Sequence, residues 1–116
     1  MEQCVIEKVR QLVLEYKQEK KISRQVEIWL PDRMARSGEV ITVADNRIEF
    51  NDPEQVWVVF VNLCPVDSMH RSCVYVMITS DGKHLASKDA RTRPSGRSGI
   101  LFRKDLEFSS QQANLV

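Results

Sequence analysis

The chain has 116 residues, a formal net charge of +1 and an ordinary globular composition, with 42% hydrophobic and 28% charged residues. This length fits one domain with its own hydrophobic core, and this composition excludes a largely disordered chain. We therefore expect a single domain over residues 1–116, with a polar tail after about residue 108 that frays.

The start of the sequence predicts neither export nor a membrane anchor. Residues 1–5 lack the basic and apolar regions of a signal peptide. The longest uninterrupted apolar run, Val56–Val61, is far shorter than the ~18 residues that span a bilayer. Three cysteines without an export signal are typical of reduced thiols. We expect a cytoplasmic protein that does not bind membranes.

The first element in chain order is an amphipathic helix over Glu2–Lys20. Its charged residues, including Lys17, are expected mostly away from the apolar side, and early acids with late bases complement the helix dipole. The apolar positions recur three and four residues apart, and they are Val5, Val9, Leu12, Val13 and Tyr16, with Ile6 beside them.

Six or seven short strands follow the helix, separated by turn residues rather than by further helices. The connection at Ala44–Asn46 fits a hairpin, and a loop is expected from Lys88 to Gly99. The fold class is therefore α+β, with the N-terminal helix packed on a predominantly antiparallel sheet of about six strands. The expected strands are Gln25–Leu30, Glu39–Val43, Arg47–Phe50, Gln55–Leu63, Cys73–Thr79, His84–Ser87 and Ile100–Arg103.

The strands Gln55–Leu63 and Cys73–Thr79 are apolar at odd and even positions alike. Successive side chains of a strand point to opposite faces, so both faces of these strands need cover. One helix covers one face, and the other is hidden either by curling of the sheet or by a partner, which includes a possible homodimer. The two candidate faces carry Trp57, Val59, Val61 and Leu63, or Val56, Val58 and Phe60.

The reactive side chains form no recognisable catalytic or metal motif. Cys64, His70 and Cys73 are zinc-type ligands, but the cysteines are nine residues apart and a structural zinc site needs four ligands. A cysteine nucleophile would need a base such as His70 or His84 and an orienting acid. We expect no metal, no cofactor and no enzymatic activity, and an enzyme using Cys73 is the least favoured alternative.

Two segments of opposite charge lie within the nearly neutral chain. From Glu39 to Glu54 there are five acids and one base, and from Lys83 to Lys104 there are seven bases and one acid. The acids form a solvated edge or a patch for a basic partner. The basic segment is a solvated loop, a site for an acidic protein or a nucleic-acid site. Nucleic acid is the least favoured, because the arginine-rich loop has no aromatic residue for stacking and the net charge is small.

In overall plan the chain resembles the immunity proteins of bacterial contact-dependent growth inhibition systems. The resemblance rests on the helix Glu2–Lys20, the acidic hairpin Glu39–Glu54 and the two apolar strands, and it includes no short motif. It implies a small cytoplasmic protein that binds one toxin domain tightly. Immunity proteins against nucleases are often acidic, whereas this chain is not. A mixed surface, with the acidic hairpin and the arginine-rich loop on opposite rims, therefore fits better than simple masking of a basic cleft.

The leading hypothesis is a non-enzymatic inhibitor that occludes the active or substrate-binding surface of a bacterial toxin that cuts RNA or DNA. The alternative is a small RNA-associated protein that uses residues 83–104. The residues predicted to bind the toxin are Asp45, Glu49, Asp52 and Glu54 toward its bases, Arg91, Arg93 and Arg97 toward its acids, and Trp57 or Trp29 as a buried anchor.

Overall fold

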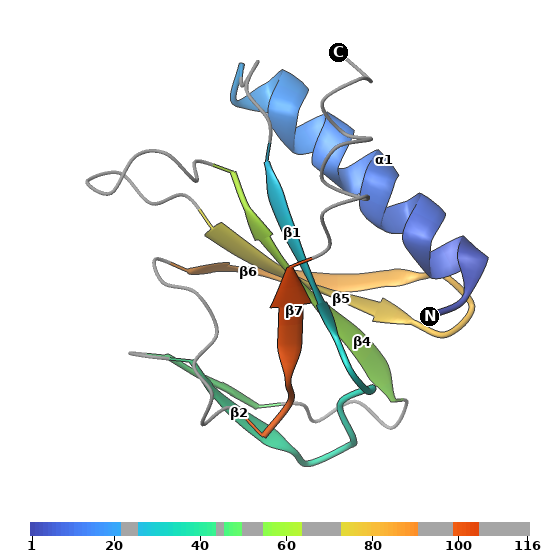
Figure 1. Ribbon diagram of the computed structural model, residues 1–116, viewed down its shortest axis with the longest axis vertical. Coiled ribbons are helices and arrows are strands. Elements are labelled where there is room, and N and C mark those ends of the chain that lie inside the picture. Colours follow the sequence, from blue (N-terminus) through green and yellow to red (C-terminus); the bar gives the residue numbers. More distant parts are fainter. Residues whose placement is uncertain (22–25, 44–45, 50–54, 64–72, 91–98, 105–116) are drawn as a thin grey trace.

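The computed structural model describes residues 1–21, 26–43, 46–49, 55–63, 73–90 and 99–104. One helix precedes all of the strands, which confirms the α+β class (Figure 1). No helix among these residues is long and apolar enough to cross a membrane. The elements are α1 Gln3–Glu19, β1 Glu27–Pro31, β2 Val40–Val43, β3 Asn46–Glu49, β4 Val56–Asn62, β5 Cys73–Thr79, β6 His84–Ala90 and β7 Phe102–Lys104.

Five of the strands form one antiparallel sheet in the order β6-β5-β4-β1-β7. The predicted hairpin is confirmed, and it stands outside that sheet as a two-stranded sheet of its own, with Val40 opposite Glu49. Most expected boundaries differ from the structure by one or two residues, and the end of β6 differs by three. β6 continues to Ala90, where the sequence predicted the start of a loop, and the last strand begins at Phe102 rather than at Ile100.

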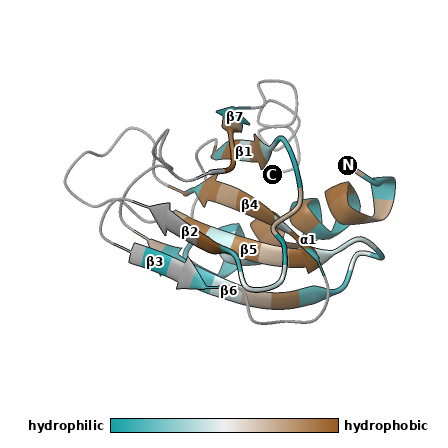
Figure 2. Ribbon diagram, turned by 90° about the horizontal axis from the view of Figure 1, so that it is seen from below, coloured by the Kyte–Doolittle hydropathy of each residue, from teal (hydrophilic) through white to brown (hydrophobic). Residues whose placement is uncertain are grey.

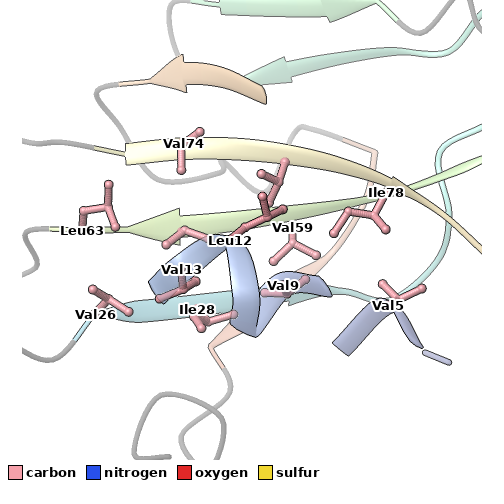
Figure 3. Close-up of a cluster of buried hydrophobic side chains, with 12 residues drawn as sticks. Val5, Val9, Leu12, Val13, Val26, Ile28, Val59, Leu63, Val74 and Ile78 are labelled. Atoms are coloured by element: carbon pink, nitrogen blue, oxygen red, sulfur yellow. The ribbon is translucent and has the colours of Figure 1, made fainter. Parts of the chain in front are cut away.

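α1 lies across one face of the sheet and buries the predicted apolar side of the helix (Figure 3). Of the two candidate faces of β4, the helix covers the one with Val59, Val61 and Leu63, and Trp57 packs at its rim. Lys17 is an exception to the predicted pattern, because it lies one turn beyond Val13 on the same side and is only 5% exposed. The helical residues of this cluster are Val5, Val9, Leu12 and Val13.

The second face of the sheet is also buried, by the chain's own segments. Ala35 is paired with Val56 through two backbone hydrogen bonds of 2.7 and 3.1 Å at the start of β4. Among the described large hydrophobic side chains, only Met1 and Leu101 are exposed. Of the two ways to hide this face, cover by the chain's own segments is the one found in the described part of the chain. The cluster consists of Ala35, Val56, Val58, Phe60, Cys73, Tyr75, Met77, Ile100 and Phe102.

A row of aromatic rings runs through this second cluster. Phe60 and Tyr75 have ring centroids 5.0 Å apart, and Trp29 and Phe102 meet them edge-on at 6.4 and 6.3 Å. The hydroxyl of Tyr75 is fully buried and has no hydrogen-bond partner among the described residues, and this burial raises its pKa. An unsatisfied buried hydroxyl costs about 1–3 kcal/mol, so the ring rather than the hydroxyl stabilises the fold.

Replacing Tyr75 by Phe keeps the ring and removes the unsatisfied hydroxyl. We expect the free energy of unfolding, measured by urea denaturation, to stay unchanged or to rise by up to about 1 kcal/mol. Tyr16→Phe is the matched control, because the Tyr16 hydroxyl lies 2.8 Å from the hydroxyl of Ser87. That variant should lose about 0.5–1 kcal/mol. A comparable loss in Tyr75→Phe would contradict the assignment.

Candidate interaction surface

The structure describes three of the nine residues named as candidate partner contacts, and one of them, Trp29, is half-buried against the second cluster. Glu49 is exposed at the end of β3. Trp57 is half-buried on β4. The six that lie outside the described residues are Asp45, Asp52, Glu54, Arg91, Arg93 and Arg97.

Trp57 already has contacts within its own chain. Its ring packs against the cluster beneath α1, and its indole Nε1 donates a hydrogen bond of 2.8 Å to Oε2 of Glu2. The carbonyl of Glu2 in turn accepts the amides of Val5 and Ile6 in the first turn of the helix. Trp57 thus fastens the start of α1 to β4, and to act as a partner's anchor it would have to give up this bond.

An ion pair anchors the foot of the β2–β3 hairpin. Arg33 donates from both terminal nitrogens to Glu39, from Nη1 to Oε1 at 2.9 Å and from Nη2 to Oε2 at 2.5 Å. Glu39 immediately precedes β2, and Gly38, with φ at +81°, makes the turn that returns it toward Arg33. The charge pattern placed Glu39 among the acids available to a partner, whereas in the structure its carboxylate is paired with Arg33.

The environment of Glu39 strongly favours its ionised form. The hydrogen bonds from Arg33, assisted by the backbone amide of Arg36 at 3.0 Å, lower the pKa of Glu39 from 4.5 to about 2. Planar bidentate pairing of this kind fixes orientation as well as charge. The pair therefore holds the hairpin foot in one geometry throughout the physiological pH range.

Two further contacts join residues of the basic segment Lys83–Lys104 to this hairpin and its foot. Nη2 of Arg33 also donates to the carbonyl of Gly99 at 2.9 Å, and Nζ of Lys88 in β6 lies 3.4 Å from the carbonyl of Arg47 in β3. Gly99 and Ala90 are the described residues on either side of the arginine-rich segment. Gly99 and Lys88, which lies two residues before Ala90, thus contact the hairpin foot and the hairpin.

Cys73, the candidate nucleophile, lies in a polar row that crosses four strands. Its buried thiol donates to Oδ1 of Asn62 at 3.7 Å, and Nδ2 of Asn62 donates to Glu27 at 3.1 Å. Glu27 is also paired with Lys104 at 3.1 Å. An amide oxygen beside the thiol accepts its proton in a hydrogen bond without acting as a base.

In the described ranges, no group of three or more His, Cys, Asp and Glu could hold a metal ion.

Tyr16, His84 and Ser87 form a polar cluster between α1 and β6 that the sequence did not predict. A bulge near Leu85 shifts the register so that His84 is opposite Ile78 and Ser87 opposite Val76, and both therefore face the helix. The Ser87 hydroxyl lies 2.7 Å from Nε2 of His84 and 2.8 Å from the hydroxyl of Tyr16.

This cluster has the residue types of a serine nucleophile with its base, but not the protonation that such a pair needs. Nε2 of His84 also lies 3.1 Å from the carbonyl of Ala86, which can only accept a hydrogen bond. A proton on Nε2 satisfies this contact, and in that tautomer Nε2 cannot take a proton from Ser87. The contacts tie α1 to β6 instead.

None of the known families, curated proteins or solved structures compared with the chain matches it.

Substitution of Glu39 by Gln tests the anchor at the hairpin foot. Because the folded pKa of Glu39 is lowered, its contribution to stability is present above about pH 4.5 and is lost as the pH falls toward 2. The pair is partly exposed, at 35% for Arg33 and 20% for Glu39, so solvent screens it. We expect Glu39→Gln to lower the free energy of unfolding by about 1 kcal/mol at pH 7, with a difference that shrinks toward zero near pH 2.

The control carries the same substitution on the same hairpin. Glu49 is exposed, so Glu49→Gln should change stability by less than about 0.5 kcal/mol at either pH. Equal losses in the two variants, or a Glu39→Gln loss that persists at low pH, would show that the ion pair does not anchor the hairpin.

Proposed function

We propose that this protein is a non-enzymatic inhibitor that binds a bacterial toxin domain, a nuclease, and occludes its active or substrate-binding surface. The observation that carries this proposal is the anchored β2–β3 hairpin. It stands outside the five-stranded sheet, its foot is fixed by the bidentate pair of Arg33 and Glu39, and it presents Arg47 and Glu49 to solvent.

Fixing a recognition element before binding supports tight association. A loop that is ordered only in the complex loses conformational freedom on binding, and this loss reduces affinity. The hairpin has polar ties at two places, from Arg33 at its foot and from Lys88 of β6 to the backbone of Arg47. The hairpin therefore loses much of its conformational freedom when the protein folds and has less to lose on binding.

The mixed charge of this region suits a partner that carries both signs. Lys88 and Arg47 are exposed beside Glu49, and Gly99, at one end of the arginine-rich segment, is bonded to the hairpin foot. These neighbours favour a single mixed surface over acidic and basic rims on opposite sides. Complementary charge speeds encounter and rejects wrong partners, which are the properties that an inhibitor of one toxin needs.

Charge reversal on the hairpin tests the proposal. The probe is a catalytically inactive nuclease toxin domain, sought among the products of the genes that adjoin this one, and affinity is measured by calorimetry. We expect Glu49→Lys together with Asp52→Lys to weaken binding by about tenfold or more, since exposed charge pairs contribute modestly and add across an interface.

The matched control is Glu7→Lys, an equally exposed reversal on α1, which lies on the other face of the sheet from Lys88 and the hairpin. It should leave affinity within about twofold, because solvent and salt screen a distant charge. No binding by the unaltered protein, or equal effects of both reversals, would refute the proposal. Salt-sensitive retention of single-stranded RNA in a filter assay would favour the RNA-associated alternative instead.

A further inference from the structure

The ammonium group of Lys17 is buried without a described partner. The residue is only 5% exposed, and its Nζ has no hydrogen-bond partner among the described residues. An ammonium group removed from water is strongly disfavoured unless an anion is placed beside it. The burial of Lys17 therefore points to a carboxylate or another anion at this position.

Lys17 lies on the flank of α1 that faces β1, near the residue at which β1 begins. Tyr16, the residue before it, is bonded to Ser87 of β6, at the edge of the sheet opposite β7. Each residue turns by about 100° around a helix axis, so Lys17 lies on the other side of the helix-sheet contact, toward β1 and β7. Figure 3 shows α1 running toward Val26, with Val13 beside it. Lys17 is one turn further along the helix.

The register of β7 on β1 predicts where the residues after β7 would lie if the strand continued. Trp29 is opposite Lys104, and the two strands are antiparallel. Continued without a bulge, this register sets Glu107 opposite Val26. Directly opposed residues share a face of the sheet, and Val26 belongs to the cluster beneath α1. The carboxylate of Glu107 would then lie on the same side of the sheet as Lys17.

The residue types that follow β7 fit this continuation. Side chains of a strand alternate between the two faces. Asp105 and Glu107 would therefore lie on the face of α1, and Leu106 and Phe108 on the face of the buried aromatic row. A slip of one residue would exchange the two sets, placing the acids against the aromatic rings. The alternation thus selects the register that brings an acid toward Lys17.

We propose that residues 105–108 extend β7 along β1 and supply the carboxylate of Glu107 to the ammonium group of Lys17. The segment follows β7 directly and has to reach only three residues beyond Lys104. This short tether gives its carboxylate a high effective concentration at the site, above that of a free anion or of a separate protein. A flank closed in this way is not available to a partner, which leaves recognition to the side of the hairpin.

A double-mutant cycle followed by urea denaturation tests this pairing. Lys17→Met removes the charge and keeps the apolar stem. We expect Glu107→Gln to raise the unfolding equilibrium constant about tenfold in the unaltered protein, because it leaves the buried ammonium group unpaired. In the Lys17→Met background it should raise this constant by less than about twofold. Glu19→Gln is the control, because Glu19 is exposed on the same helix, and its effect should be equally small in both backgrounds.

Equal effects of Glu107→Gln in the two backgrounds would overturn the proposal. Stabilisation by added phosphate that Lys17→Met abolishes would also overturn it, because the site would then hold a free anion. Nuclear Overhauser contacts between the backbones of Val26 and Glu107 should be present in the unaltered protein, and their absence would contradict the register. None of these outcomes depends on toxin binding.

Discussion

Strands β4 and β5 are apolar on both faces, and the rest of the fold is arranged to cover them. Figure 2 shows the hydrophobic colour on β4 and β5 and on α1 beside them. α1 covers one face, and Ala35, Ile100 and Phe102 join the cluster on the other. Since apolar burial is the main favourable term in folding, the short segments around Ala35 and Ile100 are as necessary to this fold as the helix is.

Burial of both sheet faces determines what remains for recognition. Of the large hydrophobic side chains described, Met1 and Leu101 are exposed, and Trp57 is engaged by Glu2. The remaining described surface therefore offers charged side chains. The hairpin offers both signs of charge in a fixed position, because Arg33 and Glu39 secure its foot.

Periodicity in the sequence predicted the helix and both faces of β4, because a spacing of 3.6 or 2 depends only on local geometry. It did not predict that Ala35 would pair with Val56, since that contact depends on how the whole chain closes. The pairing of Arg33 with Glu39 required the left-handed turn at Gly38. The cluster at Ser87 required a bulge that changes which side chains face α1, and bulges leave no clear signal in a polar strand.

Because most large apolar side chains in the described part of the chain are buried, the surface described there offers polar contacts that are individually weak. An exposed ion pair contributes about 0–1 kcal/mol, so tight binding through charge needs several pairs that are already in position. The ties from Arg33 and Lys88 to the hairpin supply such positioning through polar contacts. Anchors of this kind separate the two tasks of the fold. The sheet is buried on both faces for stability, while the exposed charges of Arg47 and Glu49 on the hairpin outside it can be replaced without altering that core.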